Sequence, residues 1–206
     1  MRSIIGRFGA LGVLPMVLAG LLVSQSQAAD PSGAAKAYFA GGCFWCMEEV
    51  FEKVPGVTAV VSGYMGGRVE HPSYEQVSAG GTGHAESVEV VYDPTKASYT
   101  TLLDAFWHNV DPVTPNAQFC DHGSQYRSVI FYQGEEQKRL AEESKRAIEQ
   151  SQRLTQPIVT ELTKASQFYP AEEYHQDFYK KNPIRYKFYK FNCGRAQRLE
   201  EVWGAP

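Results

Sequence analysis

Two consecutive glycines, Gly41 and Gly42, separate a strand-like stretch from a helix-like stretch, and this junction constrains the fold more than any other feature. Residues 37–40 have the composition of a short strand, and residues 46–51 have helical character. Glycine lets the backbone turn sharply and leaves room for a substrate close to Cys43. A thiol at the start of a helix lies near unpaired N–H groups, which lower its pKa. We therefore expect Cys43 to be a reactive thiol at a strand-to-helix turn.

Hydrophobic periodicity in the rest of the chain predicts strands interleaved with helices. The expected strands span residues 57–62, 87–92, 126–132 and 158–162, and the expected helices lie after residue 98, over residues 135–151 and between residues 169 and 182. Such interleaving favours parallel strand pairs, but the long loop over residues 108–125 argues against a doubly wound sheet. We expect an α/β fold of the α+β sandwich kind, in which helices cover a mixed sheet. The length of 206 residues is that of a single domain.

The first 28 residues have the layout of a secretory signal peptide. Arg2 and Arg7 precede an apolar run over residues 11–23, and small residues around Ala28 offer a cleavage site. The run is shorter than a membrane span of about 20 residues, although an uncleaved anchor is the alternative. We expect a signal peptide at residues 1–28, one domain at residues 29–206, and a periplasmic or secreted protein. Export also places the four cysteines where disulfides form.

The charge composition gives no reason to expect nucleic acid or an anionic membrane surface as a partner. Lys and Arg number 20 against 23 Asp and Glu, a formal net charge of −3. Basic residues within 180–190 alternate with aromatic residues, which is typical of a solvated helix or an edge strand. We expect no nucleic acid partner and no stable membrane association after cleavage.

Cys43 and Cys46 form a C-x-x-C pair whose sulfurs can meet across one helical turn, as in redox-active pairs. A structural disulfide is one alternative. Half of a zinc site is another, but without a second C-x-x-C the case for zinc is weak, and we expect no bound metal. Glu86 and Tyr126 stand at the entrances of two strands, where polar side chains can reach a cleft. His122 is interpreted as a loop histidine.

Six short blocks occur in a fixed order along the chain. The first set comprises Gly42-Cys43-Phe44-Trp45, Gly83-His84-Ala85-Glu86 and Asp121-His122-Gly123-Ser124-Gln125-Tyr126-Arg127-Ser128. The second comprises Tyr64-Met65-Gly66-Gly67, Pro72-Ser73-Tyr74 and Tyr174-His175-Gln176. With these blocks the chain resembles the peptide methionine sulfoxide reductase A family, and the resemblance extends from Lys36 to Trp203.

The resemblance implies a mixed sheet with a ferredoxin-like core and an enzyme, a peptide-methionine (S)-S-oxide reductase. Enzymes of this family reduce methionine-S-sulfoxide, free or within proteins, and so repair proteins after oxidative stress. They bind no cofactor of their own, and a thioredoxin-like protein supplies the electrons as an external thiol reductant. The implied reductase domain is the one expected at residues 29–206.

The family's site residues map onto a set of polar side chains in this sequence. By resemblance, Cys43 attacks the sulfoxide sulfur as a thiolate and becomes a sulfenic acid. Glu86 is the acid that protonates the sulfoxide oxygen, because a desolvated carboxyl keeps its proton near neutral pH. Tyr74 and Tyr126 hydrogen-bond that oxygen and polarise the S–O bond. Asp121 supports the polar side of the site.

Aromatic and thiol groups complete the implied site. Phe44 and Trp45 form an apolar wall for the S-methyl group of the substrate. The common form of the family has glycine where this chain has Cys46, and it carries its resolving cysteines in a glycine-rich tail. Two candidates for the resolving cysteine therefore remain: Cys46, because it is close to Cys43 in the sequence, and Cys193, because of its position in the tail. Cys120 is a third thiol close to the chemistry.

Two other classes of function remain alternatives at this point. A general thiol–disulfide oxidoreductase would use the Cys43/Cys46 pair, but thioredoxin-type sites place tryptophan before the first cysteine. An exported, non-enzymatic binding module would use all four cysteines in two structural disulfides. Consumption of methionine sulfoxide distinguishes the first alternative, and thiol titration of the native protein distinguishes the second.

Overall fold

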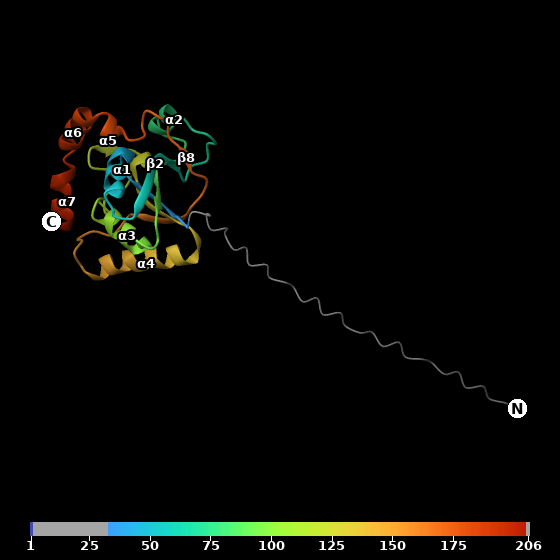
Figure 1. The fold of residues 1–206 in the computed structure, drawn as a ribbon. Helices are drawn as coiled ribbons and strands as arrows, with labels where there is room; N and C mark the ends of the chain where they lie inside the picture. The colour runs from blue at the N-terminus through green and yellow to red at the C-terminus, as the bar shows by residue number, and fades with distance from the viewer. Residues whose placement is uncertain (2–32, 205–206) are drawn as a thin grey trace.

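A six-stranded mixed sheet forms the centre of the protein in the computed structural model, which describes Met1 and residues 33–204. The strand order is β7-β6-β1-β3-β2-β8. The strands of this sheet are β1 (Ala35–Gly41), β2 (Val57–Met65), β3 (Ala85–Tyr92), β6 (Ser128–Tyr132), β7 (Glu161–Lys164) and β8 (Tyr169–Pro170). The helices are α1 (Phe44–Glu52), α2 (Tyr74–Ser78), α3 (Tyr99–Trp107), α4 (Gly134–Gln150), α5 (Phe178–Lys181), α6 (Pro183–Asn192) and α7 (Arg195–Trp203) (Figure 1).

Within the central four strands β6-β1-β3-β2 each neighbouring pair is antiparallel, and the chain order β1-α1-β2-β3-α3-β6 is that of a ferredoxin-like core. The mixed sheet covered by helices is therefore confirmed. The interleaving of strands and helices favoured parallel pairs, but only β6 and β7 pair in parallel among the described strands. Helix α1 links two strands of the same direction, but β3 lies between them, so interleaving in sequence does not produce adjacent parallel strands.

Apolar side chains that alternate along the strands divide between the two faces of the sheet. On one face, Phe39 of β1 is fully buried and stacks on Phe51 of α1 and Phe106 of α3, with ring centroids 4.7 Å and 5.3 Å away. Helix α4 covers α3, and the Trp107 indole donates a hydrogen bond to the Ser144 hydroxyl at 3.0 Å. This packing fixes the N-terminus of α1 against the ends of β1 and β3, where the candidate site lies.

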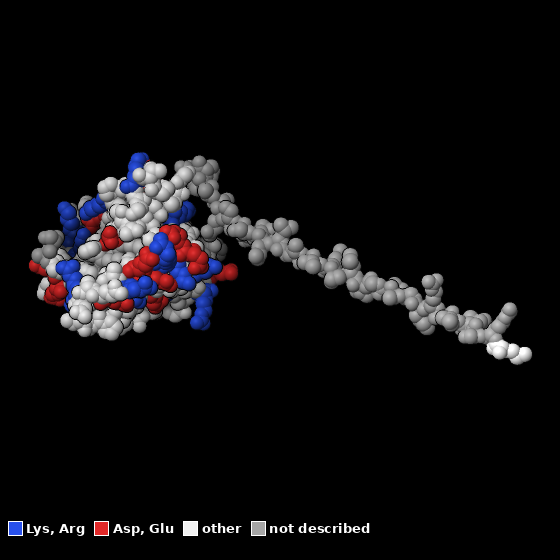
Figure 2. All heavy atoms as spheres, turned by 90° about the horizontal axis from the view of Figure 1, so that it is seen from below, with Lys and Arg blue, Asp and Glu red and all other residues white. Residues whose placement is uncertain are grey.

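The outer face of α4 carries interspersed charges of both signs. Figure 2, which views the molecule from the α4 side in Figure 1, shows basic and acidic side chains intermingled there. Arg139, for example, pairs with Glu136 at 2.7 Å and with Glu143 at 2.8 Å. Neighbouring pairs of opposite sign stabilise a helix only slightly, and they explain how a strongly charged segment forms one.

Several expected boundaries are corrected by the structure. Residues 169–170 form strand β8 rather than a helix start, because they complete the edge of the sheet beside β2. The helix expected between residues 169 and 182 is followed directly by a second one, α6, which begins at Pro183; proline suits the first position of a helix, where the backbone N–H has no partner within the helix. Tyr126 ends a 3₁₀ turn, η1 (Ser124–Tyr126), and the strand begins at Ser128 instead. Strand β7 begins at residue 161 rather than 158.

The expectations for the N-terminus fall outside the described part of the chain. Apart from Met1, the signal peptide expected at residues 1–28 lies among residues 2–32, which the structure does not describe. Over residues 33–204, no helix combines the length and the apolarity that a membrane crossing requires.

Candidate active site

A small cavity of about 80 Å³ lies where the N-terminus of α1 meets β3. Side chains from α1, α2, β3, α6, the turn η1 and the two-residue strand β5 (Asp121–His122) line it. The lining residues are Cys43, Phe44, Trp45, Tyr74, Glu86, Asp121, Tyr126 and Tyr189. The structure thus brings seven residues singled out from the sequence to one cavity, and it adds Tyr189.

Cys43 is the residue that caps the start of α1, and only 6% of its surface is exposed. Its carbonyl accepts hydrogen bonds from the N–H groups of Cys46 at 3.0 Å and Met47 at 3.3 Å. Gly42 precedes it with φ +80°, and a Cβ there would lie 2.5 Å from the Cβ of Gln118. The glycine therefore makes room for the protein's own Gln118, and the expectation that it makes room for substrate is corrected.

The Cys43 and Cys46 thiols are both buried and both free. Burial raises the pKa of the Cys43 thiol, so the lowered value expected from its helix position is not what the surroundings produce. The pKa of Cys46 is lowered, first by the hydrogen bond from Cys43 and then by the positive charges of Arg195 and Lys190. Two thiols that share a hydrogen bond titrate as a pair, so this pair readily carries one thiolate. Proton exchange between the sulfurs can place that thiolate on Cys43.

Glu86 extends from β3 toward the first turn of α1. One carboxyl oxygen accepts a hydrogen bond from the Phe44 N–H at 3.1 Å, and the residue is 3% exposed. Burial is the main cause that raises the pKa of Glu86 to about 8, and the charge of nearby Asp121 adds to it. A carboxyl with that pKa is mostly protonated at neutral pH and can donate a proton to a group in the cavity.

Two tyrosine hydroxyls face the same cavity from separate elements. Tyr74 is the first residue of α2, whose start is held by a capping box on Ser73, and its N–H donates to Glu172 at 2.8 Å. Tyr126 enters at the end of η1. Burial raises the pKa of Tyr74 to about 12 and raises that of Tyr126 further. Both phenols therefore stay protonated and are hydrogen-bond donors.

The aromatic wall is supported by residues to which the sequence analysis gave no role. Trp45 stacks on Phe178 of α5 with ring centroids 3.8 Å apart, and its indole N–H donates to His175 Nδ1 at 3.1 Å. The His175 ring also lies 5.0 Å from the Phe44 ring and 4.4 Å from the Tyr74 ring. Burial lowers the pKa of His175, which keeps the ring neutral. His175 and Phe178 thereby hold the wall in place.

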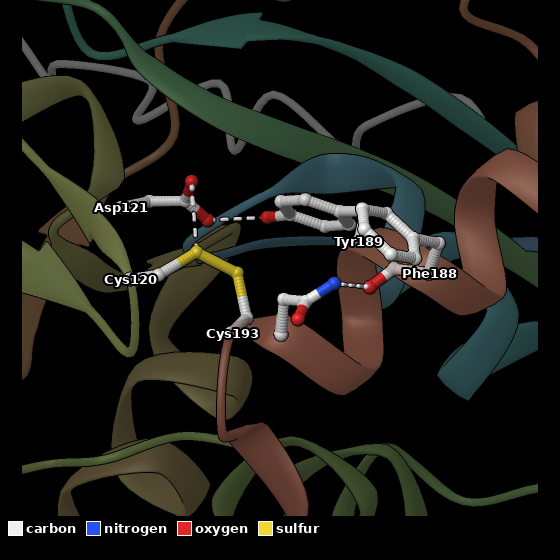
Figure 3. Close-up of a disulfide and its surroundings, with 6 residues drawn as sticks. Cys120, Asp121, Phe188, Tyr189 and Cys193 are labelled. Carbon is white, nitrogen blue, oxygen red and sulfur yellow. Dashed lines mark hydrogen bonds between the residues drawn. A yellow bond between two sulfur atoms is a disulfide. The ribbon is translucent and has the colours of Figure 1, made fainter.

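Cys193 lies in a different arrangement from Cys43 and Cys46. It forms a disulfide with Cys120, and the two Cα atoms are 4.7 Å apart (Figure 3). Cys193 therefore has no free thiol in this structure, and the free thiol that contacts Cys43 within the described residues is Cys46. Tyr189, four residues before Cys193, donates a hydrogen bond to Asp121 at 2.5 Å. The spacing of Tyr186 and Tyr189 on one helical face was the signal that could have revealed this contact.

Comparisons with known proteins agree with this arrangement. The profile of the family described as Peptide methionine sulfoxide reductase matches residues 35–206. A peptide methionine sulfoxide reductase MsrA from Listeria innocua is 50% identical over 168 residues, which cover 82% of this chain and 95% of that protein.

Two solved structures share the fold. Mxr1 from Saccharomyces cerevisiae in reduced form superimposes with a TM-score of 0.70 at 31% identity, covering 76% of this chain and 90% of that one. Methionine sulfoxide reductase A of Corynebacterium diphtheriae gives a TM-score of 0.67 at 34% identity, with coverage of 75% and 77%. The chain belongs to the peptide methionine sulfoxide reductase family, and it is a thiol-dependent oxidoreductase that reduces methionine sulfoxide.

Proposed function

We propose that this chain reduces methionine-S-sulfoxide, free or within proteins, through a sulfenic acid on Cys43 and a disulfide between Cys43 and Cys46. The observation that carries the proposal is the shared cavity of a thiol and a protonated carboxyl, Cys43 and Glu86. Thiol–disulfide exchange has no oxygen leaving group, so it does not explain a protonated carboxyl that shares a cavity with two tyrosines, Tyr74 and Tyr126. A binding module with two disulfides does not fit a structure in which Cys43 and Cys46 are free.

In the first step the Cys43 thiolate attacks the sulfur of the sulfoxide. Glu86 gives its proton to the oxygen, which is a poor leaving group unless protonated. Tyr74 and Tyr126 donate hydrogen bonds to the same oxygen and orient it. The S–O bond breaks and the oxygen, after taking up a second proton, leaves as water, so that Cys43 is joined to the methionine sulfur in a sulfonium intermediate. Water then attacks the sulfur of Cys43, the S–S bond breaks, methionine leaves and a proton is released. Cys43 becomes a sulfenic acid, so the substrate is reduced and Cys43 is oxidised by two electrons.

In the second step Cys46 attacks the sulfur of the Cys43 sulfenic acid, and a disulfide and water form. In the reduced protein the pKa of Cys46 is lowered, first by its hydrogen bond to Cys43 and then by the positive charges of Arg195 and Lys190. The two charges remain when Cys43 is oxidised, and they favour the attacking thiolate. Cys43 and Cys46 lie within one helical turn, and the backbone N–H of Cys46 donates a hydrogen bond to the carbonyl of Cys43 at 3.0 Å. Cys193 is already bonded to Cys120, so Cys46 is the resolving cysteine that we propose.

A Cys46→Ser variant is expected to complete one turnover and then to stall. Because the attack on the sulfoxide uses Cys43, the variant should release one methionine per enzyme at a rate within about tenfold of wild type. Its steady-state rate with a thioredoxin system should fall by at least about 100-fold. Single-turnover and coupled assays measure the two rates. Undiminished thioredoxin-dependent turnover would show instead that Cys120 or Cys193 resolves the sulfenic acid.

We further propose that a thioredoxin-like dithiol closes the cycle and that the protein works after export. Reduction of the Cys43–Cys46 disulfide needs two electrons and two protons, which a dithiol protein supplies. Mxr1, a protein of the same fold, has been solved in complex with Trx2. The pattern of residues 1–28 supports export, and the family match begins beyond it, at residue 35. Fractionation of bacteria that express the full chain tests the location, and N-terminal sequencing of the mature protein tests cleavage.

A further inference from the structure

Two bridges connect the end of α6 to the segment that carries Asp121. One is the Cys120–Cys193 disulfide, and the other is the hydrogen bond from the Tyr189 hydroxyl to Asp121 at 2.5 Å (Figure 3). The Cys120 sulfur also lies 3.7 Å from the other carboxyl oxygen of Asp121. The N–H of Cys193 donates to the carbonyl of Tyr189 at 3.0 Å. The disulfide and the tyrosine are therefore joined within one helical turn.

Helix α6 buries few of its side chains against the body of the protein. Only Tyr186 of this helix is buried, whereas Ile184, Phe188 and Phe191 are 85%, 73% and 85% exposed. Its Tyr186 hydroxyl and the Lys190 ammonium of the same helix contact Glu49, each at 2.6 Å. An ion pair near the surface contributes little, whereas a disulfide that closes a long loop restricts the chain strongly. The Cys120–Cys193 disulfide, with a separation of 73 residues, is thus the covalent tether of this helix end. Cys193 lies two residues before the buried Arg195, whose guanidinium donates to the carbonyl of Asn109 at 2.5 Å.

Tyr189 is placed to act on the reacting groups from α6. It lines the cavity together with Cys43, and its ring meets the Trp45 ring edge-on with centroids 5.9 Å apart. Its hydroxyl has a single proton, which it donates to Asp121; the Cys43 sulfur is the alternative acceptor for that proton, and this contact opposes the larger effect of burial, which raises the pKa of the thiol. Burial raises the pKa of Tyr189 itself, so the phenol remains a donor.

We propose that Tyr189 is a further positioning residue for the reduction of methionine sulfoxide, and that the Cys120–Cys193 disulfide holds it in place. The tyrosine donates its one proton to Asp121 while Cys43 is a thiol, and turns it to the sulfur of Cys43 when the thiolate forms. The outer disulfide carries no electrons during turnover. When an external dithiol opens it, one thiolate of the reductant attacks a sulfur, two protein thiols form, the reductant becomes a disulfide, and α6 is released. The inference rests on the proposed role of Cys43.

The proposal is tested by measuring the methionine released in a single turnover. Before the reaction Cys43 and Cys46 are reduced, and in wild type and Tyr189→Phe the Cys120–Cys193 disulfide is intact. Mass spectrometry after thiol alkylation verifies this state. Tyr189→Phe and the double variant Cys120→Ser/Cys193→Ser are each expected to slow release by about tenfold, the value of one hydrogen bond. Each should also move the rising limb of the pH–rate profile to higher pH by about one unit, because the thiolate loses a donor. A variant that combines Tyr189→Phe with Cys120→Ser/Cys193→Ser should be little slower than either variant alone, since both remove the same interaction of the Tyr189 hydroxyl.

Tyr179→Phe is the matched control, because Tyr179 donates its hydrogen bond to Glu52 and does not line the cavity. It should leave both the rate and the pH profile unchanged. Tyr189→Phe keeps the ring, so the proposal can be tested even if the double cysteine variant does not fold. A wild-type rate and pH–rate profile in either variant would overturn the proposal. If only thioredoxin-dependent turnover falls, Cys120 and Cys193 relay electrons instead. A wild-type enzyme that releases no methionine would contradict the proposed function itself.

Discussion

Replacing Cys43 with serine is expected to abolish reduction of methionine sulfoxide, with kcat/KM at least about 10⁴-fold below wild type. A serine hydroxyl at this position is not ionised near neutral pH, and it cannot form the sulfenic acid. The rest of the cavity remains, because Cys43 and Ser differ by one atom and the backbone contacts of the helix start are kept. The measurement is methionine released from separate S and R epimers of a sulfoxide peptide.

Cys46→Ser is the control for that experiment, since it makes the same substitution one helical turn away. It should still release the first methionine, whereas Cys43→Ser should release none. Wild type should reduce only the S epimer. If Cys43→Ser retained more than a few per cent of the first-turnover rate, the nucleophile would be a different group, and the assignment of the cavity would be wrong. Circular dichroism of each variant shows whether the fold is kept.

Local sequence patterns predicted the elements that carry the chemistry, because their causes are local. The glycines before Cys43, the strand expected at residues 87–92 and the helix expected after residue 98 all correspond to observed elements. The strand-to-helix turn at Cys43 follows from backbone requirements that a few residues express. The resemblance to a family then identified which polar groups share one site.

Features that depend on tertiary contacts were not predictable in the same way. The pKa of Cys43 follows from its burial beneath α6, which no spacing near Cys43 reveals. The pairing of Cys120 with Cys193 joins residues 73 positions apart, and sequence patterns do not determine disulfide connectivity. The antiparallel neighbours of β1 depend on β3 lying between β1 and β2. Each of these errors arose where a distant segment decides the local environment.

Glu86→Gln is expected to lower kcat by about 10²- to 10⁴-fold at pH 7, the usual contribution of a general acid. The amide keeps the shape of the side chain and can still accept the hydrogen bond from the Phe44 N–H, but it has no proton to transfer. In wild type the rate should fall as pH rises through about 8, where Glu86 loses its proton. That falling limb should be absent in the variant. Glu89→Gln on the same strand, where Glu89 binds Lys36 and Tyr38 outside the cavity, should leave kcat unchanged.

The same substitution should make the protein more stable at alkaline pH. The pKa of Glu86 is raised from 4.5 to about 8 on folding, so the native state holds a proton that the unfolded chain has lost. Stability associated with this group is complete below pH 4.5 and is lost as pH rises toward 8, by up to about 5 kcal/mol. Glutamine has no such pH dependence, so the difference in unfolding free energy between variant and wild type should grow over that interval and level off above it. Urea unfolding at pH 5 and pH 8.5 measures it, and a constant difference would mean that Glu86 is ionised in the native state and cannot be the acid.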